Sequence, residues 1–176
     1  NYGAIFLNNT GIDYINISDC DIVGNKAESM GGIFIGAGDH IVLNNCRIDS
    51  NISNGSAGGL FLSGNDNVQI SNCLFTNNEA NDYAAFYTDA GEFILRNSTV
   101  ANNTDNSVHT ASIGFGGSSD DNLIFNSIIY EPNHPTRDVY ISGGNLSLFN
   151  NLLYHTSLVG YNGNLPIVES NNVFST

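Results

Sequence analysis

Apolar and polar residues alternate in short blocks along the whole chain. Residues 15–18 read Ile-Asn-Ile-Ser and residues 68–71 read Val-Gln-Ile-Ser, so every second position is apolar. A period of two is the pattern of a β-strand that buries one face and exposes the other. No block shows the spacing of an amphipathic helix, so the pattern predicts short strands throughout.

The blocks recur at a nearly constant distance. Residues 31–35, Gly-Gly-Ile-Phe-Ile, return at 58–62 as Gly-Gly-Leu-Phe-Leu and are preceded at 3–7 by Gly-Ala-Ile-Phe-Leu. Looser copies of this strand lie at 84–88, 111–115 and 137–141, and a second block recurs at 15–20, 41–46, 68–73, 93–98 and 146–151. A fixed period of about 20 to 50 residues indicates a solenoid.

A third block is short. In it an apolar residue is followed three positions later by Asn, as in Ile48 with Asn51 and Phe75 with Asn78. Three short strands in a coil of about 26 residues cannot bury a hydrophobic face alone, so parallel coils must stack about 4.8 Å apart. Such crossovers are right-handed. We therefore predict an all-β fold, a right-handed parallel β-helix of about six to seven coils with three short strands each.

Stacking places equivalent residues above one another in columns. One column lies at the end of the second strand, where the chain must bend; it contains Asp19, Asn45, Asn72, Asn97, Asn126, Asn150 and Asn171. Asparagine tolerates left-handed backbone dihedrals, and stacked amides can hydrogen-bond to one another. We interpret the column as a structural Asn ladder rather than a ligand-binding row.

Two further kinds of column are predicted to lie inside. Cys20, Cys46 and Cys73 share one column, as buried thiols or with a disulfide between neighbouring coils. The apolar columns contain Ile22, Ile48, Phe75, Val100, Ile129, Leu153 and Phe174, with Ile33, Leu60 and Val139 in the first strand. These columns form the core and imply no cofactor.

An aromatic row follows the first strand between two inward positions. It consists of Phe6, Phe34, Phe61, Tyr87 and Tyr140. Alternation points these rings outward, and a long exposed apolar row suggests sugar stacking, a lateral partner or a covering loop. The alternative is that the rings stack on one another.

The charge excludes some partners. Four Lys and Arg residues against 17 Asp and Glu give 4 − 17 = −13, so phosphate backbones and anionic membranes are repelled, and nucleic acid is not expected as a partner. No apolar run reaches the roughly 18 residues of a membrane-spanning helix. We treat residues 1–176 as a single β-helix domain.

Neither end shows the polar cap that a solenoid normally carries. Residues 2–7 already read as a strand, and residues 164–176 end within a coil. We expect either a fragment of a longer protein or a subunit that stacks end to end with copies of itself.

One repeat carries a family resemblance. Gly58-Gly59-Leu60 followed by Phe75-Thr76-Asn77-Asn78 resembles the repeats of polymorphic outer-membrane proteins and related β-helix passenger domains, and the resemblance extends over residues 3–103. It implies a secreted or surface-exposed, adhesin-like protein.

The predicted fold also resembles the pectate lyase superfamily, whose members cleave acidic polysaccharides with calcium and a basic residue. The four basic residues, Lys26, Arg47, Arg96 and Arg137, fall in separate coils, so we assign no catalytic residue, metal or cofactor. Binding of calcium to the acidic loops is left as an open alternative. A site, if present, would involve the less regular region of Asp120, Asp121, His134, Arg137 and Asp138.

Sequons for N-glycosylation lie in expected loops at Asn51, Asn54 and Asn102. Taken with the repeats, they favour an extracellular or cell-surface structural or adhesive protein and not an enzyme. The alternatives are a polysaccharide lyase or glycoside hydrolase, and a glycan-binding module that uses the aromatic row.

Overall fold

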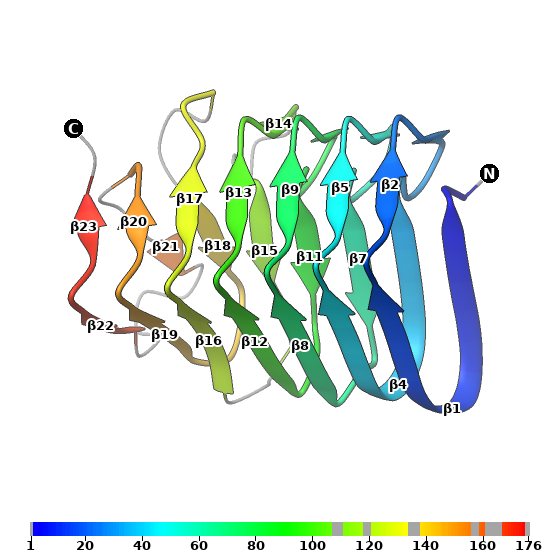
Figure 1. Ribbon diagram of the computed structural model, residues 1–176, viewed down its shortest axis with the longest axis horizontal. Helices are drawn as coiled ribbons and strands as arrows, with labels where there is room; N and C mark the ends of the chain where they lie inside the picture. Colours follow the sequence, from blue (N-terminus) through cyan, green and yellow to red (C-terminus); the bar gives the residue numbers. More distant parts are fainter. Residues whose placement is uncertain are drawn as a thin grey trace.

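The computed structural model describes residues 2–106, 111–117, 121–133, 138–155, 159–160 and 167–174. These residues form parallel strands that wind coil after coil along the long axis of the molecule (Figure 1). No helix among them is long and apolar enough to cross a membrane.

The largest sheet has 12 strands among the described residues and folds around two sides of each coil. β1 (Ile5–Ser18) and β4 (Ile33–Asn44) run through both sides. The first side continues with β7 (Leu60–Ser63), β11 (Phe86–Thr88), β15 (Ile113–Phe115), β18 (Val139–Ile141) and β21 (Val159–Gly160). The second side continues with β8 (Asn67–Ser71), β12 (Glu92–Arg96), β16 (Asp121–Phe125), β19 (Leu146–Phe149) and β22 (Ile167–Ser170).

Two smaller sheets complete the coil. The seven-stranded sheet contains β2 (Asp21–Val23), β5 (Arg47–Asp49), β9 (Leu74–Thr76), β13 (Thr99–Ala101), β17 (Ile128–Tyr130), β20 (Leu152–Leu153) and β23 (Val173–Phe174). The four-stranded sheet contains β3 (Lys26–Ala27), β6 (Ile52–Ser53), β10 (Glu79–Ala80) and β14 (Thr104–Asp105).

The predicted right-handed parallel β-helix is confirmed, with two differences. In-register partners such as Ile22 with Ile48 and Ile48 with Phe75 are about 26 residues apart, as the repeats required. The described chain completes about five turns, slightly fewer than the six to seven coils expected. The two-residue strands of the four-stranded sheet form a fourth side that the sequence pattern did not reveal.

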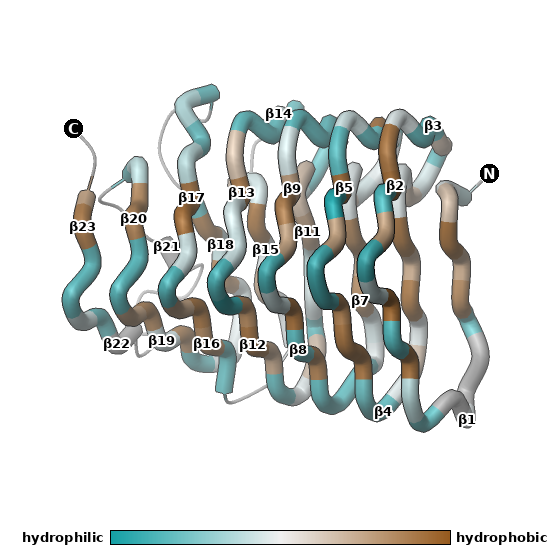
Figure 2. Tube along the Cα trace, viewed as in Figure 1, coloured by the Kyte–Doolittle hydropathy of each residue, from teal (hydrophilic) through white to brown (hydrophobic). Residues whose placement is uncertain are grey.

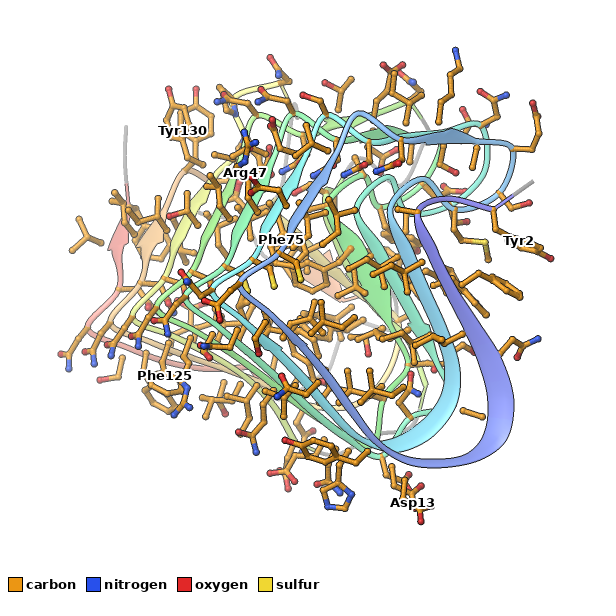
Figure 3. All side chains as sticks on the ribbon, turned by 45° about the vertical axis from the view of Figure 1, so that its right-hand side comes forward. Tyr2, Asp13, Arg47, Phe75, Phe125 and Tyr130 are labelled. Atoms are coloured by element: carbon orange, nitrogen blue, oxygen red, sulfur yellow. The ribbon has the colours of Figure 1, made fainter. Side chains whose placement is uncertain are left out.

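Every second side chain enters a continuous core. In Figure 2 the apolar positions of neighbouring coils lie beside one another along the axis. The predicted inward column is at most 5% exposed from Ile22 to Leu153, and Phe174 is partly buried. Phe75 lies in the interior (Figure 3), with its ring centroid 5.5 Å from that of Phe86. Each such ring or aliphatic group stabilises the fold by about 1.5–3 kcal/mol.

The bend after the second strand has the expected conformation. The seven residues of the predicted Asn ladder, from Asp19 to Asn171, have positive φ angles of 49–56°. Some of their amides bond along the axis: Nδ2 of Asn150 donates to Oδ1 of Asn126 at 3.3 Å, and Nδ2 of Asn45 donates to Oδ1 of Asp19 at 2.5 Å. This column is exposed, so these bonds stabilise the bend and do not fill the core.

Candidate functional site

The aromatic row forms on the outer face of the first side, in the register that the repeats predict. Phe6, Phe34, Phe61 and Tyr87 are direct partners in successive strands. Neighbouring ring centroids are 4.9, 5.8 and 5.0 Å apart, with interplanar angles of 17–28°. The rings are therefore stacked on one another along the helix axis.

Exposure along the row is smaller than expected. Phe6 is 40% exposed, and Phe34, Phe61 and Tyr87 are half-buried. Tyr140 was expected to face solvent, but it is only 6% exposed because its ring packs near that of Tyr83, 6.0 Å away. The expected exposure of Tyr140 is wrong.

The aromatic row lacks a side chain at one strand position, and the ring of Tyr83 fills the space. The strand position between Tyr87 and Tyr140 is held by Gly114, which has no side chain. The ring of Tyr83 occupies this space: a Cβ on Gly114 would lie 2.4 Å from its Cδ1 atom. The Tyr83 centroid lies 5.1 Å from that of Tyr87, so the row continues across the gap.

The stacking limits what the row can bind. A sugar ring stacks on the open face of an aromatic ring, whereas the faces of Phe34 and Phe61 are covered by their neighbours in the row. Solvent meets mainly ring edges. The geometry thus favours the interpretation that the rings stabilise one another by stacking. It argues against the interpretation that the row is a surface on which sugars stack.

A second ladder, inside the molecule, was not identified from the sequence. Asn25, Asn51, Asn78 and Asn103 follow the strands of the seven-stranded sheet, and the last three are fully buried. Nδ2 of Asn51 donates to Oδ1 of Asn78 at 3.0 Å, and Nδ2 of Asn78 donates to Oδ1 of Asn103 at 3.0 Å. The amides of Asn51, Asn78 and Asn103 each also donate to a strand carbonyl, as Asn78 does to Ile48 O at 2.9 Å.

Glu131 terminates this interior ladder. Its side chain is fully buried; Oε1 accepts hydrogen bonds from Asn103 Nδ2 at 2.7 Å and Ser112 Oγ at 2.8 Å, and Oε2 accepts one from Asn103 N at 2.7 Å. Burial raises the pKa of Glu131 to about 7, although the hydrogen bonds from Asn103 and Ser112 act in the opposite direction.

Asp138 is the second buried carboxylate. It accepts hydrogen bonds from the backbone N–H groups of Tyr154 at 3.0 Å and His155 at 2.8 Å, and its Oδ1 lies 2.9 Å from Nδ1 of His155. Burial raises the pKa of Asp138, and the contacts with His155 oppose that rise. Both buried carboxylates therefore serve internal contacts.

A surface hollow of about 360 Å³ lies at the bend between β1 and β2. Its lining includes Cys20, Cys46 and Arg47. The guanidinium of Arg47, which lies on the outside of the coil (Figure 3), bonds through Nε to Oδ1 of Asp21 at 3.1 Å. Both side chains of this pair are largely exposed, so it contributes little to stability.

The cysteine column lies beside the same bend, and its three thiols are free. Cys46 and Cys73 are 3% exposed, as the predicted inward column requires. Cys20 is exposed, so the prediction is wrong for this residue.

The structure separates the three glycosylation candidates. Asn54 and Asn102 are exposed. Asn51 is fully buried in the interior ladder, and its Nδ2 donates to Ile22 O at 2.9 Å and to Asn78. The folded protein cannot present Asn51 to a glycosyltransferase, so that expectation is wrong.

The irregular region singled out in the sequence is only partly described. Asp120, His134 and Arg137 lie outside the described residues. Asp121 is exposed at the start of β16, whereas Asp138 is buried and accepts hydrogen bonds from Tyr154 N and His155 N. Within the described residues, no group of three or more His, Cys, Asp or Glu side chains is arranged to hold a metal ion.

The sequence matches the family model of the right-handed β-helix region over residues 3–175. A search of curated proteins and a search of solved structures each returned no match.

Proposed function

Because the chain belongs to the right-handed β-helix family, we propose that it is a stiff, non-enzymatic segment of an extracellular or cell-surface protein with a structural or adhesive role. The resemblance of its repeats to those of adhesin-like passenger domains supports this proposal. A fold of this kind hosts several unrelated functions, so the argument depends on how the side chains are used.

The interior ladder carries the proposal. Asn51, Asn78, Asn103 and Glu131 are fully buried, and their polar atoms bond from one coil to the next at 2.7–3.0 Å. Hydrogen bonds in a dry interior resist distortion because an unpaired partner there is strongly penalised. Coils coupled in this way form a rod that transmits force along its axis.

The aromatic row adds a second coupling on the outside. Its ring-to-ring contacts follow the same axis as the interior ladder. The row serves a structural role in this proposal, and a glycan partner would have to contact ring edges or other groups.

The edge strand β2 offers a place where a further coil can add. Cys20 O accepts from Arg47 N at 2.9 Å, and Gly24 N donates to Asp49 O at 3.0 Å. Since strand N–H groups alternate in direction, the N–H of Val23 points away from β5. The next coil on that side would come from the same protein or from a second copy.

Cryo electron microscopy of the purified chain tests the proposal together with a polysaccharide cleavage assay. We expect rods that join along the coil axis, and no release of reducing ends or unsaturated products from acidic or neutral polysaccharides, with or without calcium. Val23→Pro removes the outward N–H and should block axial joining, whereas Val23→Thr, the matched control, should not.

Discrete particles combined with turnover of a polysaccharide would overturn the structural reading. The search for a catalytic site would then move to the region around Asp121 and Asp138.

A further inference from the structure

The cysteine column places two thiols opposite each other in adjacent coils. Asp21 pairs with Arg47 in the strands that follow, and Arg47 N donates to Cys20 O at 2.9 Å. Strands in a sheet are about 4.8 Å apart, within the Cα separation of about 4.4–6.8 Å that a disulfide requires. The backbone register therefore brings Cys20 and Cys46 within bonding range.

Cys20 and Cys46 both line the surface hollow at the bend. Sγ of Cys20 donates to Ser18 O at 3.0 Å. Sγ of Cys46 lies 3.4 Å from Ile17 O, in the preceding coil, and 3.3 Å from Asn44 O. The Cys46 thiol therefore leans toward the first coil, which carries Cys20.

The three cysteines differ in their access to a reagent. Cys20 is exposed and lines the surface hollow together with Arg47. Cys73 is 3% exposed, and burial raises its pKa to about 11; burial also raises the pKa of Cys46. Since the thiolate is the attacking species, reaction with an external disulfide begins at Cys20.

We propose that Cys20 and Cys46 are a redox pair that forms a disulfide between the first two coils by exchange with a small-molecule disulfide, while Cys73 remains a thiol. The Cys20 thiolate attacks the small disulfide, forms a mixed disulfide and releases one thiolate. Cys46 then loses its proton and attacks Sγ of Cys20, which releases the second thiolate. The protein dithiol is oxidised, and the small disulfide is reduced to two thiols that take up the protons.

The second step explains how a buried thiol takes part. Cys46 does not meet the reagent; it attacks a sulfur already held in the neighbouring coil. The product joins coils that otherwise depend on hydrogen bonds and packing, so it should raise the unfolding temperature in the oxidised form.

Incubation of the folded protein with oxidised glutathione, followed by acid quenching, alkylation and peptide mass spectrometry, tests the inference. We expect loss of two hydrogens per chain, a linked pair of peptides containing Cys20 and Cys46, and alkylation of Cys73 only after unfolding. Cys46→Ser should retain one glutathione on Cys20, Cys20→Ser should not react while folded, and Cys73→Ser should behave as the wild type.

Three results would overturn the inference: glutathione retained on Cys20 of the wild-type protein, a link between Cys46 and Cys73, or an unreactive Cys20. The peptide map of the wild-type chain is sufficient to distinguish these three results from the expected one. The test therefore remains valid even if one serine variant fails to fold. Circular dichroism of each variant identifies that case, and reduction with dithiothreitol should reverse the rise in unfolding temperature.

Discussion

Each asparagine of the interior ladder depends on the conformation of the residue before it. Gly24, Ser50, Asn77 and Asn102 directly precede the ladder positions and have positive φ angles of 69°, 57°, 54° and 56°. This left-handed conformation turns the chain sharply and directs the following side chain inward. Asn and Gly adopt it at low energy, which explains why the ladder residue is often preceded by one of them.

Replacing one ladder amide should be strongly destabilising. Asn78→Ala leaves the N and Nδ2 groups of Asn51 and the carbonyl of Ile48 without their buried partner. We expect the free energy of unfolding to fall by about 3–5 kcal/mol, measured by urea denaturation. Asn106→Ala removes one exposed bond, to Glu79, and should change it by less than about 0.5 kcal/mol. Equal losses in the two variants would contradict a buried ladder.

Glu131 should make stability depend on pH in the direction opposite to an ordinary salt-bridged carboxylate. Its pKa is raised from 4.5 to about 7 in the folded protein, so the folded state holds the proton more tightly than the unfolded state. The stabilisation that Glu131 contributes is then fully present below pH 4.5 and decreases as the pH rises to 7, with a slope of up to about 1.4 kcal/mol per pH unit.

Glu131→Gln should remove this contribution, because the amide has no charge to bury. The unfolding temperature of the variant should therefore change less with pH between 4.5 and 7 than that of the wild type, as measured by thermal unfolding at a series of pH values. Asp138 contributes in the same direction but is present in both proteins, so the difference between the two profiles isolates Glu131. Parallel profiles would show that the carboxylate has no raised pKa.

At the scale of the strands, the aromatic row depends on a space that only Gly114 leaves. Gly114→Ala places a Cβ 2.4 Å from the Tyr83 ring, which must move. We expect a loss of about 1–3 kcal/mol in the free energy of unfolding. In a Tyr83→Ala background the same change should cost much less, and a double-mutant cycle measures the difference. Additive effects would show that the two positions do not interact.

The strands and columns could be predicted from the sequence because each coil repeats the same residue types at the same positions. Ile22, Ile48 and Phe75 are separated by one coil each, so a vertical alignment identified them as core. The bend asparagines followed from the same alignment, because their left-handed conformation is a local preference of the residue.

The interior ladder could not be recognised in the same way. The Asn that follows each short strand looks like a loop residue, and the sequon at Asn51 strengthened that reading; only the three-dimensional turn shows that its side chain is buried. Glu131 is harder still, because it follows Ile129 by two residues rather than three and reaches Asn103 with a longer side chain. Tyr83 lies outside the strands, so the strand pattern gave no sign of its place in the row.

At the scale of the whole molecule, the net charge of −13 should oppose folding through self-repulsion. Sodium chloride shortens the Debye length from about 10 Å at 0.1 M to about 3 Å at 1 M, so the unfolding temperature at pH 7 should rise over this range. Near pH 4.1, the isoelectric point, the same salt series should have little effect. A fall in unfolding temperature with salt at pH 7 would mean that favourable ion pairs such as Arg47 with Asp21 dominate.

The interior ladder also sets the unit in which this protein can change length. Asn51 and Asn78 each accept from the amide of one neighbouring coil and donate to the amide of the other, so these two positions are interchangeable. Excision of residues 52–78 would remove β6, β7, β8 and β9 and leave Asn51 facing Asn103, so the hydrogen bonds of the ladder could form again. Deletion of a single residue would instead move every later ladder residue out of register with the preceding coil. Insertions and deletions during evolution are therefore expected in steps of one whole coil, and relatives should differ in length by multiples of about 26 residues.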